Sequence, residues 1–292
     1  MNRCNTWRLP LRMARNSSAL LISLVPLLVL AQVPPTQNLA LVKPVISQSE
    51  DGPPFESAFT PGESVFFSFL AEGHKTGPTG KVQLTGHIQA FDPKGIAISV
   101  VDEQVIATTL AEEDKQWKPK VRSQFLIPAI APPGSYRIRY DVTDEQTKKK
   151  VSGETTFPVK GRAVEPSKEL VIRELGFYRT QDDEAPLKNA VYRAGDMLWV
   201  KLDITGYKYG EQNSIDVAYD VEVLAPGGKS LFSQADAAVE RSQAFYPQPW
   251  VPAEFNLSLQ TTMTPGPYAL VITAHDATGH QTATAKAEFR VQ

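Results

Sequence analysis

Hydrophobic and polar residues alternate along residues 133–144, which follow the order Pro-Gly-Ser-Tyr-Arg-Ile-Arg-Tyr-Asp-Val-Thr-Asp. Tyr136, Ile138, Tyr140 and Val142 fall on one side of this alternation and charged or polar residues fall on the other. A period of two residues is typical of a β-strand with one buried and one solvated face. The Pro-Gly pair ahead of it indicates a turn. The pattern therefore predicts a strand that begins directly after a tight turn.

The same pattern returns 132 residues later, over residues 265–276, which begin Pro-Gly-Pro-Tyr. Other landmarks recur in the same order at nearly the same offset, which indicates an internal repeat. The matched landmarks are 59–69 with 192–202, 73–75 with 206–208, 81–91 with 215–224, Trp117 with Trp250, Phe125 with Leu257, and Phe157 with Phe289.

Each copy offers about seven short strands separated by turn residues, and its most helix-like stretch, residues 234–243, is expected to make one or two turns at most. This arrangement predicts an all-β chain of two tandem immunoglobulin-like antiparallel β-sandwich domains. The expected boundaries place the first domain at 39–160, a linker at 161–168 and the second domain at 169–292.

The strand after Pro-Gly resembles the penultimate strand of bacterial extracytoplasmic immunoglobulin-like domains, including those similar to fibronectin type III or macroglobulin domains. In such domains a tyrosine early in this strand can fix a corner by bonding to backbone upstream, and Tyr136 and Tyr268 match that position. Ile138 and Leu270 stand where antibody-type domains place a disulfide cysteine. The resemblance implies adhesion, spacing or partner binding, although a fold alone does not define a function.

The first 31 residues have the features of a secretory signal peptide. Four arginines precede an apolar run over residues 19–30, and small residues lead to an expected cleavage between Ala31 and Gln32. An uncleaved membrane anchor is the alternative, but the run is shorter than the ~20 apolar residues that a spanning helix needs. We therefore expect an extracytoplasmic protein, periplasmic or secreted, with no membrane insertion after signal removal.

Charge and cysteine content narrow the range of partners. Cleavage removes four of the 30 basic residues and no acidic residue, which leaves 26 against 32, a net charge of −6. Nucleic-acid binding normally requires a basic surface, so we expect no nucleic-acid partner. The single cysteine, Cys4, lies in the signal segment, so the exported chain must be stable without disulfides.

Catalytic signatures are absent from the sequence. It contains no Gly-x-Ser-x-Gly and no His-Glu-x-x-His motif, which removes the common esterase and zinc-hydrolase patterns. Two clusters leave a metal site open, since imidazoles and carboxylates are metal ligands. They are His275, Asp276 and His280 near the last hairpin, and Asp182, Asp183 and Glu184 in a loop. Ordinary turns are the alternative for both clusters, and we expect no metal and no cofactor.

The leading expectation is a non-enzymatic binding, spacer or cell-envelope interaction module whose partner is another protein or an envelope component. One alternative is an accessory carbohydrate-binding protein, for which Trp117 and Trp250 are the candidate residues. Their repetition, each with a proline two residues later, also fits a structural plug. A metal-assisted hydrolase is the third alternative. His74, which corresponds to Tyr207 in the second copy, is expected to fill a strand end as an aromatic residue and not to act as a ligand.

Overall fold

The computed structural model describes residues 38–114 and 116–292. The expected signal peptide at 1–31 and the cleavage site between Ala31 and Gln32 lie outside the described residues. No helix in the described part of the chain has the length and apolar character needed to cross a membrane. Within the same residues the secondary structure is β-strand apart from two short 3-10 helices, Glu112–Asp114 and Glu211–Asn213. The expected all-β fold class is therefore confirmed.

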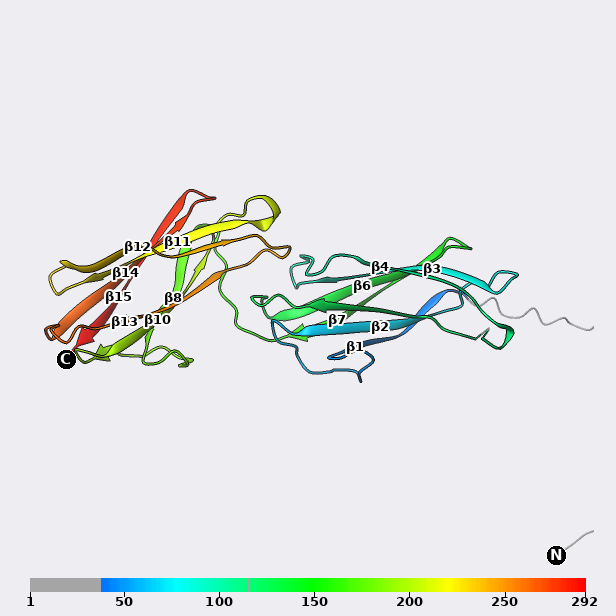
Figure 1. The fold of residues 1–292 in the computed structure, drawn as a ribbon, viewed down its shortest axis with the longest axis horizontal. Helices are drawn as coiled ribbons and strands as arrows, with labels where there is room; N and C mark the ends of the chain where they lie inside the picture. The colour runs from blue at the N-terminus through cyan, green and yellow to red at the C-terminus, as the bar shows by residue number, and fades with distance from the viewer. Residues whose placement is uncertain (1–37, 115) are drawn as a thin grey trace, which may run out of the picture. The chain divides into compact units, whose positions relative to one another are not determined.

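The first sandwich consists of two antiparallel sheets (Figure 1). One sheet has the strand order β1-β2-β5 and the other has the order β4-β3-β6-β7. A parallel bridge from Phe59 to Val159 adds a short contact at the edge of β7. The strands are β1 (Ala40–Ser47), β2 (Ser64–Glu72), β3 (Lys81–Phe91), β4 (Asp102–Thr109), β5 (Lys120–Leu126), β6 (Gly134–Asp144) and β7 (Lys149–Val159).

The second sandwich repeats this topology. Its sheets have the orders β13-β10-β8 and β12-β11-β14-β15-β9, and β9 pairs in parallel with β15, as Phe59 does with β7. The repetition confirms two sandwiches of one kind, while the domain boundaries stay a prediction. The strands are β8 (Val171–Tyr178), β9 (Val191–Tyr192), β10 (Met197–Thr205), β11 (Ile215–Leu224), β12 (Ser230–Ser242), β13 (Val251–Ser258), β14 (Gly266–Asp276) and β15 (Gln281–Val291).

One local expectation was wrong. Residues 234–243 were expected to be helix-like, but they fall almost entirely within the 13-residue strand β12. β12 is an edge strand that pairs only with β11 in its sheet, and nearly all of its residues are exposed. A strand solvated on both faces lacks the alternation by which strands are recognised, so only pairing with β11 determines its conformation.

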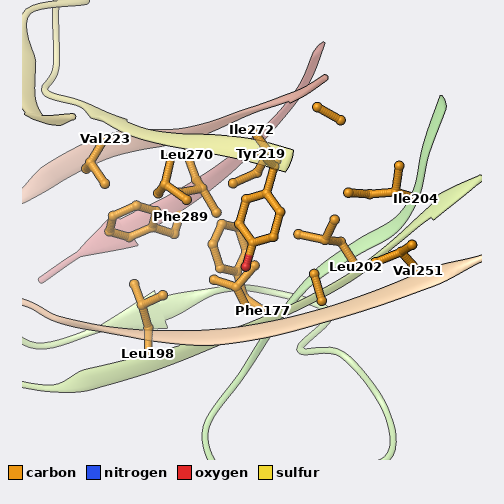
Figure 2. Close-up of a cluster of buried hydrophobic side chains, with 14 of the residues drawn as sticks. Phe177, Leu198, Leu202, Ile204, Tyr219, Val223, Val251, Leu270, Ile272 and Phe289 are labelled. Carbon is orange, nitrogen blue, oxygen red and sulfur yellow. The ribbon is translucent and has the colours of Figure 1, made fainter. Parts of the chain in front are cut away.

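Each sandwich closes over buried side chains from both sheets. In β2 and β3 buried and partly exposed residues alternate along nearly the whole strand, as the sequence pattern predicts. Figure 2 shows the core of the second sandwich, in which Phe177 and Leu198 from one sheet face Leu270 and Phe289 from the other. Because side chains of the two sheets interdigitate, the packing of these residues fixes the spacing of the layers.

The tyrosine corner is present in both sandwiches. Tyr136 donates a hydrogen bond from its hydroxyl to the carbonyl oxygen of Pro132 at 2.8 Å, and Tyr268 donates to that of Thr264 at 2.8 Å. Burial raises the pKa of Tyr136, and the nearby charge of Asp92 adds to that shift. The expected hydrogen bond from each tyrosine to the backbone of the loop before Pro-Gly is confirmed.

Candidate functional site

The His275, Asp276 and His280 cluster does not converge on one point. His275 lies on the outer face of β14 and its Nε2 atom is 2.9 Å from a carboxylate oxygen of Asp220. Asp276 is 2 % exposed and accepts hydrogen bonds from the backbone N–H groups of Lys208 and Gly279, both at 2.9 Å. His280 lies in the turn between β14 and β15 with a positive φ of 52°. Asp276 therefore links the loop at Lys208 to the turn at Gly279 through hydrogen bonds.

Asp144 has the same structural role in the first sandwich. Its carboxylate accepts hydrogen bonds from the backbone N–H groups of Lys75 at 2.7 Å and Gln146 at 2.9 Å. Both aspartates continue the buried side of the alternation in β6 and β14. The sequence could have indicated this role, because both aspartates stand on the buried side of the alternation and a buried carboxylate needs hydrogen-bond partners.

The Asp182, Asp183 and Glu184 cluster is an ordinary turn. Asp183 accepts hydrogen bonds from the backbone N–H groups of Arg179 and Thr180 at 3.0 Å, and from the Thr180 hydroxyl at 2.9 Å. These bonds lower the pKa of Asp183. Among residues 38–114 and 116–292, no three His, Cys, Asp or Glu side chains are grouped as a metal site would require. The geometry therefore gives no support to the metal-assisted hydrolase.

The outer face of the sheet β4-β3-β6-β7 carries a hollow of about 740 Å³. Acidic and basic side chains alternate across this face. His87 on β3 lies between Glu103 on β4 at 3.7 Å and Asp141 on β6 at 2.9 Å, and Lys150 on β7 reaches the other oxygen of Asp141 at 3.0 Å. Each pair comes from neighbouring strands, so the sheet pairing brings together residues far apart in the sequence.

A second row of side chains runs beside the first. Arg139 on β6 contacts Glu154 on β7 at 3.0 Å, and its guanidinium carbon lies 4.9 Å from the centre of the Phe91 ring. Val101, at the β4 edge of the hollow, is exposed. This face, which we call the charged face, therefore combines ion pairs, a cation–π contact and exposed aliphatic surface. We define it by His87, Phe91, Val101, Arg139, Asp141, Lys150 and Glu154.

The second sandwich repeats the charged face only in part, because it pairs His275 with Asp220 and Arg241 with Asp216 across its strands. The positions that match Arg139 and Asp141 hold Val271 and Thr273. Thr273 lies 3.4 Å from Thr284 across the strand pair, hydroxyl to hydroxyl. The outer face of the second sandwich therefore has the same strand frame with different chemistry.

The two candidate tryptophans differ in exposure. Trp250 is 5 % exposed, whereas Trp117 is 39 % exposed and lines a cleft of about 520 Å³ at one end of the first sandwich. The structural-plug interpretation therefore holds for Trp250. Paired exposed tryptophans would have favoured the carbohydrate alternative, and the described residues do not provide that pair at these positions. Only Trp117 remains as a candidate.

Sequence reasoning missed an ion pair at the linker, in which one partner, Asp203, is buried. Arg162, within the expected linker 161–168, directs both terminal guanidinium nitrogens at the carboxylate of Asp203 on β10, one of them at 2.6 Å. Asp203 is 1 % exposed, and burial raises its pKa while Arg162 acts in the opposite direction. An acidic residue inside the apolar strand 197–205 is the signal that could have pointed to such a partner.

Comparisons with known proteins add little to this geometry. No family model matches the chain, and no curated protein matches it. Among solved structures, the chain is similar to the C-terminal domain of the Streptococcus pyogenes antigen I/II-family protein AspA, with 9% sequence identity and a TM-score of 0.31. The likeness covers 85% of this chain and 99% of that one. At this TM-score the likeness carries no argument. The strand topology by itself defines the class, that of all-β chains with two antiparallel β-sandwiches.

Proposed function

We propose that this chain is an exported, non-enzymatic binding module that docks a protein partner on the charged face of its first sandwich. Export is supported by the signal-like segment 1–31, and a location outside the cytoplasm follows from it. The absence of catalytic motifs from the sequence supports a role in binding. The two sandwiches supply rigid frames on which outward side chains can vary without disturbing the core.

The observation that carries this proposal is the chemistry of the charged face. Arginine and aromatic residues are enriched in the centres of protein interfaces, where they supply much of the binding energy. Arg139 and Phe91 lie together on this face, and Val101 adds exposed aliphatic surface at its edge. The matched face of the second sandwich lacks this combination, so packing of the sandwich itself does not require it.

The charges on this face favour a protein surface over a polyanion. Arg139 and Lys150 are each paired with a carboxylate, Glu154 and Asp141 respectively. A partner with both signs of charge can exchange these pairs for pairs across the interface, which gives specificity and a fast association rate. A polyanion would meet the carboxylates as well as the cations and would be repelled in part.

Affinity capture tests the proposal. The exported protein, expressed from the full sequence with a C-terminal tag, is incubated with extract of the cell envelope. We expect it to retain a protein that the double variant Arg139→Glu, Lys150→Glu fails to retain. The matched control is Lys286→Glu, an exposed residue on β15 at the position that corresponds to Glu154. Exposed substitutions of this kind usually change stability little.

The expected result is capture by the wild type and by Lys286→Glu, with at least about a tenfold loss in the double variant, which corresponds to 1.4 kcal/mol of binding free energy. Circular dichroism checks that the double variant keeps its fold. Equal capture by all three proteins would contradict the assignment to the charged face, and capture of no protein would contradict the docking function.

A further inference from the structure

The cleft at the end of the first sandwich has a counterpart in the second that is closed. In both sandwiches a strand, β2 or β10, runs into a glycine of positive φ, 71° at Gly73 and 83° at Gly206. A Cβ atom would meet the carbonyl oxygen of Asn38 at 2.2 Å at Gly73, and that of Glu169 at 1.9 Å at Gly206. Both positions therefore require glycine, and the backbone course is the same in the two copies.

The residue after each glycine differs, and so does its environment. In the second sandwich Tyr207 is 5 % exposed, and its hydroxyl donates to the carbonyl oxygen of Gln248 at 2.6 Å. Tyr209 donates to the same carbonyl at 2.5 Å, and Trp250 is buried. Tyr207 and Trp250 therefore fill this end of the second sandwich, and the Tyr207 hydroxyl is satisfied, as expected for a buried tyrosine. Tyr209 is 42 % exposed.

In the first sandwich the corresponding positions leave polar groups at an open cleft. His74 replaces Tyr207, and its Nδ1 atom is buried with no hydrogen-bond partner among the residues that the structure describes. The ring of Trp117 lies edge-on to the imidazole, with centroids 6.4 Å apart and planes at 81°. A buried polar atom left unpaired costs free energy. This atom is sealed from solvent, so the rest of the half-buried imidazole is what lines the cleft.

The lining of the cleft indicates the class of ligand. Trp117 supplies an aromatic surface, and Asn38 and Gln116 supply amides that both donate and accept hydrogen bonds. The charged groups of the lining, Glu72 and Lys118, are paired with each other. The cleft volume of about 520 Å³ lies within the usual range for small-molecule sites.

A pyranose ring matches this chemistry. It presents a face of C–H groups that packs on an aromatic ring, and a rim of hydroxyls that suits amides and a neutral imidazole. A phosphate would need more than one lysine, and the one lysine of this cleft is already paired with a carboxylate. A metal ion would need several free anionic ligands. We propose that the Trp117–His74 cleft is a binding site for a neutral saccharide, separate from the charged face.

Titration by NMR tests this site directly. The exported protein, labelled with 15N, is titrated with four neutral tetrasaccharides: cellotetraose, maltotetraose, tetra-N-acetylchitotetraose and xylotetraose. Three tryptophans, Trp117, Trp199 and Trp250, lie after the expected cleavage site, and the indole N–H signal of each is assigned from single substitutions. We expect at least one sugar to shift the Trp117 signal saturably and to leave that of Trp250 unchanged.

Two variants and one control complete the design. Trp117→Ala should remove binding, and His74→Tyr, which copies the second sandwich, should weaken binding by about tenfold or more by filling the cleft. Lys150→Glu, on the charged face, should leave sugar binding unchanged, so that failure of this site and failure of the protein-docking proposal are distinguished. The proposal is overturned if all four sugars leave the Trp117 signal unchanged. It is also overturned if a sugar still shifts the other NMR signals in the Trp117→Ala variant.

Discussion

At one end of the first sandwich His74 and Trp117 border an open cleft, whereas in the second sandwich Tyr207 and Trp250 are buried at the matched positions. The backbone around both pairs is the same. Each copy has the required glycine, and in each a buried aspartate accepts a hydrogen bond from the backbone N–H group of the residue that follows the histidine or tyrosine. The comparison shows that the fold fixes where these side chains stand, and that residue identity decides whether they fill the end of the sandwich or leave a site.

The two tryptophans give the largest expected contrast. Trp250→Ala should lower the free energy of unfolding by roughly 3–5 kcal/mol, because it leaves a cavity in a buried position. Trp117→Ala should cost less than about 1 kcal/mol, since the exposed ring already contacts solvent. Urea denaturation of the two variants measures both values. Similar costs would contradict the difference in burial between the two tryptophans.

The buried aspartates should behave alike in the two copies. Asp144→Ala and Asp276→Ala each leave several partly buried backbone N–H groups without their carboxylate acceptor, so each should cost about 2–3 kcal/mol. The measurement is the denaturant midpoint, with the exposed Glu288→Ala on β15 as the control that should change little. A large cost at only one of the two positions would mean that the aspartate stabilises the loops in one sandwich and not in the other.

The tyrosine corners should also match, with a smaller effect. Tyr136→Phe and Tyr268→Phe should each cost about 1 kcal/mol, because each loses one hydrogen bond and leaves a carbonyl unpaired. Tyr140 packs on Phe67 and Phe69 with ring centroids 4.9 and 4.8 Å apart, so Tyr140→Phe should cost less. Denaturant midpoints of the three variants test this prediction. Unshifted midpoints for both corner variants would show that the tyrosine hydrogen bonds do not stabilise the fold.

The smallest expected effect concerns pH and distinguishes the copies again. Burial lowers the pKa of His74 below its ordinary value of 6.5, although the charge of Asp144 acts in the opposite direction. The unfolded chain therefore binds a proton more readily than the folded chain, so this contribution to stability is lost as pH falls through about 6.5. His74→Tyr, which copies Tyr207, removes the effect.

Subtraction isolates this contribution from the rest of the protein. The free energy of unfolding is measured at pH 7.5 and pH 5.5 for the wild type and for His74→Tyr, so that other titrating groups such as Asp203 cancel in the difference. We expect the wild type to lose more stability than the variant between the two pH values. An equal loss in both proteins would show that His74 is not desolvated.

The sequence by itself determined the features that depend on local pattern. Alternation in residues 133–144 and 265–276 placed β6 and β14, because a sandwich strand has one buried and one solvated face. The offset of 132–133 residues showed that one fold occurs twice, and the Pro-Gly-x-Tyr order located both tyrosine corners, since the hydrogen bond closes over only four residues.

Only the tertiary structure decided what depends on residues far apart in the chain. His275 pairs with Asp220, and His87 with Asp141, because β-strands distant in sequence are neighbours in a sheet. β12 is a strand because β11 offers it hydrogen bonds, although its own pattern shows no buried face. Likewise Trp117 and Trp250 are equivalent in sequence, and only the packing around them buries one and leaves the other at a cleft.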